Sequence, residues 1–299
     1  MSIKPPRPTF PPLNALRAFE VAARLGGIAK AADELCVTPG AVAQQIKSLE
    51  DWAGAPVFRR QAKGVVLSDL GQSCAREFEA AFDLLALATQ HLRTRAAPND
   101  IRIAALPSLA QLWLAPRMPA LRAAFPKALI SIAALEQCPN MARDGYDIAI
   151  FLEPIAKTQS GSQRQVLALD QILPVCAPGL AGNVKTPADL ADTLWLKDSL
   201  WHRDWQIWLE ATGTLLPTHP QSLSFTLYAL AVAEACAGAG ILMGHDMLVA
   251  PQLDSGALVA PLGRSVATGK AVTARLAPQD RRVLPREIVA ALAGGLPVA

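Results

Sequence analysis

The sequence predicts an all-α N-terminal part with one β-hairpin, a long linking helix, and a C-terminal α/β part. In the first 95 residues, apolar side chains recur at spacings of three and four, as in amphipathic helices. From residue 101 onward, short apolar runs alternate with helical segments, which is typical of α/β domains with mainly parallel sheets. Residues 96–100 form a linker, where Pro98 ends the preceding helix.

Length and composition agree with this division. A chain of 299 residues suits two domains, and 52% hydrophobic with 18% charged residues allows a sizeable core. The net charge is only +3, but residues 1–65 hold nine Lys and Arg against five Asp and Glu. Residues 96–299 hold sixteen of each kind. The basic excess therefore lies at the N-terminal end, where a nucleic-acid-binding part would need it.

Three short helices are predicted, at about residues 13–25, 29–35 and 39–53. Thr38 is a good N-cap for the third helix, and Pro39 suits its first position because that N–H would be unpaired anyway. The apolar stripe of the third helix follows spacings of four, three and four, and consists of Val42, Ile46, Leu49 and Ala53.

The pattern of residues 57–67 predicts a strand, a basic turn and a second strand, with Lys63 and Gly64 at the tip. Two helices, a tight turn, a third helix and this β-wing form the plan of a winged helix-turn-helix domain over residues 12–68. A helix of this size fits the major groove of DNA. The first part of the chain is therefore predicted to bind double-stranded DNA.

Polar residues lie on the third helix opposite its apolar stripe. Gln44 and Gln45 can hydrogen-bond adenine edges, and Lys47 can reach phosphate or guanine. Basic residues of the wing can hold phosphates or enter the minor groove. The alternative is a solvated helix face beside an ordinary basic hairpin. The predicted DNA-binding residues are Lys30, Thr38, Pro39, Gly40, Gln44, Gln45, Lys47, Arg59, Arg60 and Lys63.

Residues 69–95 predict a long helix, which Ser68 or Asp69 can cap. Large apolar side chains fall at alternating spacings of four and three, and such an a/d seam requires a partner helix. The alternative is packing of this helix on its own domain. The predicted dimer seam consists of Phe78, Phe82, Leu85 and Leu92.

The C-terminal part, residues 101–299, alternates strands and helices. Strands are predicted at residues 101–106, 129–135, 147–152, 172–176 and 240–243. Helical segments are predicted at residues 109–125, with prolines interrupting, and at residues 227–237.

Enzyme motifs do not fit this sequence. Residues 263–270 have one residue too many between the glycines of a phosphate-binding loop, and residues 238–244 follow a helix where a dinucleotide-binding fingerprint follows a strand. The five cysteines are widely spaced, odd in number and lack a CxxC pair, which fits reduced thiols in the cytoplasm. Residues 1–12 contain no apolar run of the kind a signal peptide has. We predict no enzyme, no cofactor, no metal site and no membrane contact.

Residues 13–60, followed by VVLSDLGQ at residues 65–72, resemble the N-terminal region of LysR-type transcriptional regulators, in the branch that includes glycine-cleavage and β-lactamase regulators. The segments IRIAALPSLAQLWLAPRMPALRAAFP, DGYDIAIFLE and LPVCAPGL resemble the effector domain of that family. This resemblance implies two subdomains of periplasmic-binding-protein type, at about residues 101–167 with 278–299 and at about 168–277, with a cleft between them.

The resemblance also implies partners. These are promoter or operator DNA, a small-molecule effector in the cleft, RNA polymerase, and further copies of the chain as a dimer or tetramer. Two alternatives stay open: a DNA-binding regulator without a ligand, and a solute-binding or enzymatic α/β protein whose N-terminal helices serve only for assembly.

The sequence departs from the family pattern at several positions. Gly27, Ile28 and Ala29 stand where Ser and Phe-Thr are usual, and Ala43-Gln44 replaces Ser-Arg in the recognition helix. In the effector part, Phe151 replaces an Arg, and Ala134-Leu135-Glu136 replaces a loop that often supplies a hydroxyl. These changes disfavour a conventional carboxylate effector and leave the operator sequence open.

Candidate effector contacts follow from the resemblance. Ser108 stands at a helix start, where its hydroxyl can either cap the helix or, with the free N–H groups, bind a polar ligand. Thr226 begins a predicted helix of the second subdomain and is a candidate contact from the facing wall, while aromatic residues can line the cleft or belong to the core. The predicted contacts are Ser108, Leu109, Trp113, Glu136, Phe151, Thr226 and His245.

Overall fold

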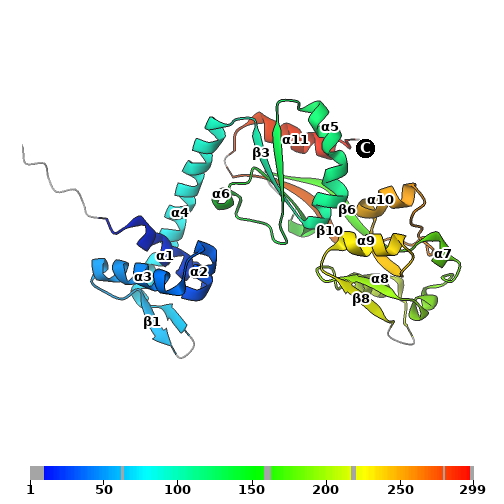
Figure 1. Cartoon of the computed structure of the whole chain (residues 1–299), viewed down its shortest axis with the longest axis horizontal. Helices are drawn as coiled ribbons and strands as arrows, with labels where there is room; N and C mark the ends of the chain where they lie inside the picture. Colours follow the sequence, from blue (N-terminus) through cyan, green and yellow to red (C-terminus); the bar gives the residue numbers. More distant parts are fainter. Residues whose placement is uncertain (1–9, 62–63, 158–162, 217–219, 279, 297–299) are drawn as a thin grey trace, which may run out of the picture. The chain divides into compact units, whose positions relative to one another are not determined.

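The computed structural model describes residues 10–61, 64–157, 163–216, 220–278 and 280–296. The chain forms two compact units, residues 1–90 and residues 91–299. Helix α4 (Asp69–Ala96) begins in the first unit and ends in the second, as Figure 1 shows. The predicted succession of a helical part, a long helix and an α/β part is confirmed.

Three helices form the body of the first unit: α1 (Leu13–Leu25), α2 (Ile28–Leu35) and α3 (Pro39–Ala53). The Thr38 side chain accepts a hydrogen bond from the Ala41 N–H at 3.2 Å, so the predicted N-cap forms. The predicted stripe of α3 points inward at Val42, Ile46 and Leu49, which are buried, whereas its fourth member, Ala53, is exposed at the end of the helix. These side chains pack with the buried residues of α1 and α2 in one core. The short helices are thus held by tertiary packing as well as by their caps.

The wing consists of β1 (Phe58–Gln61) and β2 (Gly64–Leu67), paired antiparallel with Phe58 opposite Leu67. The Glu50 carboxylate, near the end of α3, accepts hydrogen bonds from the N–H groups of Val57 and Phe58 at 2.8 and 3.2 Å. These two bonds fix the wing relative to α3, because they join the helix directly to the start of β1.

Helix α4 starts at the cap that the sequence predicts. The Ser68 hydroxyl accepts from the Gly71 N–H at 3.0 Å and donates to the Pro56 carbonyl at 2.7 Å. Phe78 packs edge-on against Phe19 of α1, with ring centroids 5.4 Å apart. Phe78 therefore packs, half-buried, against the core of its own domain, which is the alternative to a dimer seam at this position.

The other predicted seam residues lie differently. Phe82 is half-buried, whereas Leu85 and Leu92 expose 44% and 73% of their surface. Leu84, beside them on α4, is 66% exposed. The described part of α4 therefore presents leucines that this single chain leaves uncovered.

The described part of the second unit contains one eight-stranded mixed sheet in the order β4-β3-β5-β10-β6-β9-β7-β8. β3 is parallel to β4 and β5, and β7 is parallel to β8 and β9. The two long central strands, β6 and β10, pair antiparallel with each other. The strands are β3 (Asp100–Ala105), β4 (Leu129–Ala134), β5 (Ile148–Pro154), β6 (Arg164–Val175), β7 (Trp195–Asp198), β8 (Ser222–Phe225), β9 (Ile241–His245) and β10 (Val266–Leu276).

The sheet thus has two parallel halves joined by two strands, β6 leading out and β10 leading back. The prediction of mainly parallel sheets holds within each half, while the antiparallel centre was not predicted. β10 pairs with β5 from Lys270 onward, so the return into the first half begins ahead of residue 278, the limit expected from the sequence. The antiparallel centre follows from geometry, because two crossings between the halves must run in opposite directions.

Helical segments cover the sheet, and the first of them is irregular. The π-helical turn η1 (Leu109–Leu114) leads into η2 (Ala115–Arg117) and then α5 (Met118–Ala124). The prolines at positions 116 and 119 interrupt this segment, as predicted. The remaining helical segments are α6 (Met141–Asp144), η3 (Ile155–Lys157), α7 (Pro178–Ala181), η4 (Pro187–Asp192), α8 (Asp204–Thr212), α9 (Tyr228–Cys236), α10 (Asp246–Asp254) and α11 (Val283–Ala293).

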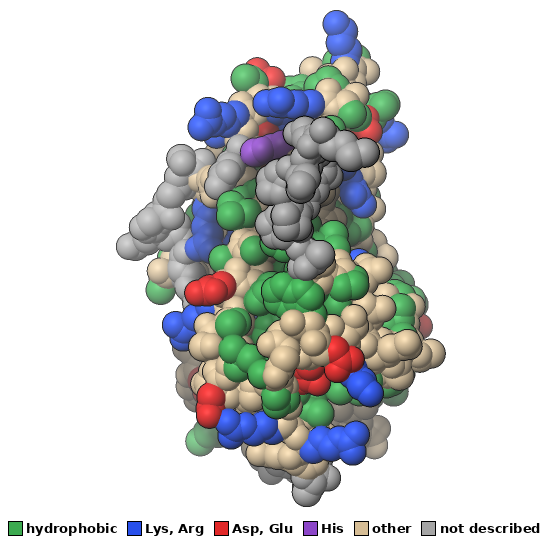
Figure 2. Space-filling view, turned by 90° about the vertical axis from the view of Figure 1, so that its left-hand side faces the viewer, with side chains coloured by type: hydrophobic (Ala, Val, Ile, Leu, Met, Phe, Trp, Pro, Cys, Tyr) green, Lys and Arg blue, Asp and Glu red, His purple; other side chains and the backbone are tan. Residues whose placement is uncertain are grey.

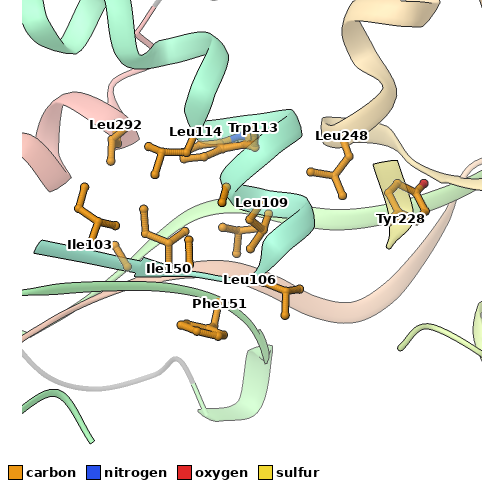
Figure 3. Packing of buried hydrophobic residues seen from close by; sticks show 14 of the residues in the cluster. Ile103, Leu106, Leu109, Trp113, Leu114, Ile150, Phe151, Tyr228, Leu248 and Leu292 are labelled. Carbon is orange, nitrogen blue, oxygen red and sulfur yellow. The ribbon is translucent and has the colours of Figure 1, made fainter. Parts of the chain in front are cut away.

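Apolar packing continues through both halves of the sheet. Figure 3 shows Ile103 and Ile150 of the first half beneath Trp113 and Leu114, with Leu248 of α10 in the same cluster. A second cluster in the other half contains Trp195 stacked on Trp205, with ring centroids 3.7 Å apart. Because such cores are closely packed, the junction between the two halves is rigid, and polar side chains at the junction are held in defined positions.

Candidate functional site

The exposed face of α3 carries most of the predicted DNA-binding residues. Gln44 and Lys47 are exposed, and Gln45 is half-buried. Thr38, Pro39 and Gly40 form the exposed start of the helix. Because Val42, Ile46 and Leu49 on the opposite side are buried, this polar face of α3 is available to a partner. Its glutamine amides provide the paired donor and acceptor that adenine edges require.

Basic residues flank α3. Lys30 is exposed on α2, and Arg59 and Arg60 are exposed on β1. The Arg59 guanidinium lies 2.6 Å from the Asp69 carboxylate, and both side chains are largely in solvent. Figure 2 shows Lys and Arg side chains near the lower end of this unit, where Figure 1 places β1, interspersed with acidic ones. Lys63 lies outside the described residues.

In the second unit, a cavity of about 200 Å³ brings together both halves of the sheet. Of the seven predicted effector contacts, it is lined by Ser108, Glu136 and Thr226. Ser108 follows β3, Glu136 follows β4 in the same half, and Thr226 follows β8 in the other half. The other lining residues are Pro107, Asp198, Ser199, Leu200, Trp201, Leu227 and Tyr228.

Ser108 has an unusual hydrogen-bonding state. It is 4% exposed, and its side chain makes no capping hydrogen bond to η1. Within the part of the chain that the structure describes, its Oγ has no hydrogen-bond partner. Of the two roles open for this serine, the structure gives no hydrogen bond for the capping role. A buried hydroxyl without a partner is costly, so this atom favours a partner from outside the chain.

Asp198 ends β7 and was not predicted from the sequence. It is 7% exposed, and its Oδ1 accepts hydrogen bonds from the N–H groups of Leu200 and Trp201 at 2.8 and 3.2 Å. Burial raises the pKa of Asp198, while these two bonds act in the opposite direction. The four-residue strand that carries it has no alternating pattern, so no local signal marked this aspartate.

His245 lies behind the wall of the cavity. Its Nδ1 is 2.7 Å from Asp170 Oδ1, and its Nε2 is 3.0 Å from Asp204 Oδ2. Burial lowers the pKa of His245, but hydrogen bonds and charges from the two aspartates outweigh it and raise the pKa to about 9. The imidazole is therefore positively charged at neutral pH. Its predicted contact with an effector is replaced by contacts with these carboxylates.

Two wall residues connect His245 to the cavity. The Trp201 ring lies with its centroid 3.8 Å from that of His245. The Tyr228 hydroxyl accepts the His245 N–H at 2.9 Å and donates to the Met243 carbonyl at 3.0 Å. A shift of Trp201 or Tyr228 at the cavity wall would therefore alter contacts of the buried, charged His245.

The three remaining predicted contacts lie in the core instead of on the cavity wall. Leu109, Trp113 and Phe151 are 1%, 3% and 6% exposed, and Figure 3 shows them within the apolar cluster. Trp113 packs there while the Arg117 guanidinium lies 4.4 Å from its ring centroid. The apolar spacing of η1 turns Leu109 and Trp113 into the core, and Phe151 enters the same core from β5.

Two family models match the chain. The model for the bacterial regulatory helix-turn-helix protein, lysR family, matches residues 13–72, and the model for the LysR substrate binding domain matches residues 95–292. The chain belongs to the LysR family of transcriptional regulators. The resemblance inferred from the sequence is thereby confirmed. This membership disfavours the alternative in which the N-terminal helices of an α/β protein serve only for assembly.

This LysR-family regulator has relatives over most of its length. The glycine cleavage system transcriptional activator of Escherichia coli (strain K12) is 35% identical over 255 residues, covering 84% of this chain and 83% of that protein. The HTH-type transcriptional activator AmpR of Rhodobacter capsulatus is 34% identical over 271 residues, covering 90% and 91%. Both are regulators of transcription by name, as is the family to which this chain belongs.

A solved structure has the same fold in the second unit. The AmpR effector binding domain from Citrobacter freundii is 22% identical, with a TM-score of 0.56, over 66% of this chain and 97% of that domain. Among the described residues of this LysR-family regulator, no helix is long and apolar enough to cross a membrane. The same residues contain no group of three or more His, Cys, Asp and Glu able to hold a metal ion.

Proposed function

We propose that α3 and the wing of this LysR-family regulator read operator DNA and that the cavity beside Ser108 binds its effector. The first assignment rests on the polar face of α3, exposed opposite the buried Val42, Ile46 and Leu49. The second rests on the buried Ser108 hydroxyl, which lacks a partner among the described residues and belongs to a wall of the cavity. The protein acts in the cytoplasm, where its DNA is, and carries out no catalysis of its own.

Base reading and phosphate contact are separate tasks on this surface. Gln44 and Gln45 read base edges, and Lys47 with the start of α3 positions the helix on the backbone. Lys30, Arg59 and Arg60 hold phosphates on either side. The exposed Leu85 and Leu92 of α4 pack on a second copy of the chain, so that two recognition helices face successive half-sites.

A DNase footprint of the full chain on the DNA upstream of its own gene, with random DNA as competitor, tests this proposal. We expect protection at two or more patches spaced by whole helical turns, about 10 base pairs or multiples. Protection equal on random DNA, or no protection on any fragment recovered by genome-wide selection, would overturn operator reading by α3. A chain with Gln44→Ala and Gln45→Ala together provides the matched control for base reading.

A further inference from the structure

We propose that the effector of this regulator is a small molecule with a protonated amino group, held by Glu136 and Asp198. The proposal rests on the proposed role of the cavity as the effector site. It goes further by assigning the charge of the ligand from the chemistry of the walls. The family membership itself assigns no such charge to this chain.

The charges on the cavity walls have one sign. Glu136 and Asp198 both line the cavity, and none of the described lining residues is Lys, Arg or His. Glu136 follows β4 in one half of the sheet, whereas Asp198 ends β7 in the other half. A cation between them is attracted to both halves at once, while an anionic ligand would meet two like charges.

The buried groups behind the wall add to this field. Asp198 lies within electrostatic range of Asp204 and His245. Asp204 bonds the imidazole Nε2 of His245, and Asp170 bonds its Nδ1. Two of these carboxylates, Asp170 and Asp204, bond the single imidazolium of His245, so the negative charge in this buried group exceeds the positive charge even before Asp198 is added. Such a group in a low-dielectric interior attracts a cation more strongly than an exposed acidic patch does.

The neutral wall residues also suit an ammonium group. An ammonium carries three N–H donors and no acceptor, so it needs acceptors around it. Glu136 and Asp198 supply carboxylate acceptor oxygens, and the wall also contains Ser108, which is only 4% exposed and whose Oγ is unpartnered among the described residues. Trp201 and Tyr228 also line the cavity and bring no positive charge to its wall.

The size of the cavity restricts the ligand. Its volume of about 200 Å³ lies below the ~300–1,000 Å³ of pockets for drug-sized ligands. A short amine fits a cavity of this volume. Three four-carbon compounds that differ only at their ends form a matched set of probes: putrescine with ammonium ends, 1,4-butanediol with hydroxyl ends, and succinate with carboxylate ends.

Calorimetric titration of the full-length protein with each probe tests the proposal. We expect putrescine to bind at least tenfold more tightly than 1,4-butanediol, and succinate to bind more weakly than either. Glu136→Gln and Asp198→Asn should each weaken putrescine binding at least tenfold, because each removes one charge and keeps the shape. Asp192→Asn, at an exposed aspartate outside the cavity, should leave it unchanged.

Folding of the variants is kept separate from binding. The amide introduced by Asp198→Asn keeps an acceptor oxygen for the N–H groups of Leu200 and Trp201. Glu136 is exposed, so thermal unfolding should change little in the Glu136→Gln chain. Tighter binding of succinate than of putrescine, or putrescine binding that neither substitution weakens, would overturn the amine class. No binding by any of the three probes would overturn it as well.

The outcomes also distinguish this inference from the proposed function. If succinate or 1,4-butanediol binds and Ser108→Ala weakens that binding, the cavity is an effector site and only the amine class fails. If the footprint fails with the same protein preparation, DNA reading fails independently of the ligand. Putrescine binding together with a footprint that putrescine alters would support both.

Discussion

His245 is buried against Asp170, with 2.7 Å between the imidazole Nδ1 and the carboxylate Oδ1. The second oxygen of Asp170 accepts a hydrogen bond from the Thr268 hydroxyl at 2.6 Å. These residues lie on β9, β6 and β10, and Asp204 joins the group from the start of α8. Charge-assisted hydrogen bonds therefore join β6 and β10, the two strands that cross between the halves, to β9.

The raised pKa of His245 predicts a pH dependence of stability. Because the folded chain holds this proton up to a pKa of about 9, against 6.5 for the ordinary group, protonation stabilises the folded state. This contribution is complete below pH 6.5 and is lost as the pH rises through about 9. It amounts to about 3 kcal/mol. Urea unfolding of the full chain, followed by tryptophan fluorescence between pH 6 and 9, measures it.

The matched substitutions are His245→Gln and His202→Gln. The first should lower the unfolding free energy more at pH 6 than at pH 9, since it leaves two buried carboxylates without their cation. The second changes an exposed neighbouring histidine and should leave the pH profile as in the wild type. A wild-type profile that stays flat over this range would contradict a buried imidazolium.

Gly71 permits the close approach between α4 and the wing. A Cβ atom at this position would lie 2.1 Å from the Val57 carbonyl oxygen, so Gly71→Ala must displace the backbone. We expect the DNA-binding unit to lose about 2 kcal/mol of stability. Gly40→Ala is the control, because its Cβ would meet only the Thr38 hydroxyl oxygen, at 3.9 Å. Equal melting temperatures for the two variants, measured by thermal unfolding, would refute the close approach.

Gln44→Ala should reduce discrimination between operator and random DNA. The exposed amide can pair with a base edge, and one good bidentate pair provides about 1–3 kcal/mol of discrimination. Binding constants on both DNAs, measured by fluorescence anisotropy at a fixed salt concentration, give the ratio. A loss of equal size on operator and random DNA would count against base reading at this position.

Arg59→Ala should weaken binding to operator and random DNA alike. The pair with Asp69 is largely exposed, and exposed ion pairs contribute little, so Arg59 can exchange this partner for a phosphate. The slope of log affinity against log salt should fall by about 1. Arg122→Ala, at an exposed arginine of α5 in the second unit, should leave the slope unchanged. An unchanged slope in Arg59→Ala would exclude this phosphate contact.

Two apolar residues of α4 should behave in opposite ways. Phe78→Ala removes a ring packed edge-on against Phe19 and should lower the stability of its own domain by about 3 kcal/mol. Leu92→Asp, at a leucine 73% exposed, should leave that stability unchanged but reduce the oligomer to smaller species. Light scattering after size-exclusion chromatography reads the second effect. If the Leu92→Asp oligomer has the same mass as the wild-type oligomer, Leu92 is not part of the dimer seam.

The N-terminal unit could be predicted from local sequence because its determinants are local. The stripe of Val42, Ile46 and Leu49, the cap at Thr38 and the proline after it all act within one helix or turn. The contact of Phe78 with Phe19 could not be predicted, since the spacing of apolar residues identifies an apolar face but not the surface that covers it. The wing followed from its basic turn, of which residues 62 and 63 lie outside the described residues.

By itself, the sequence determined the order of the elements, the recognition helix with its two faces, and the family. Only the tertiary structure decided which polar residues meet at the cavity and behind it. Asp170 and Asp204 reach His245 from positions 75 and 41 residues away, and Asp198 reaches the cavity from a strand without a pattern. Periodicity reports which face of an element is buried, whereas the pairing of buried charges depends on how the two halves of the sheet are joined by β6 and β10.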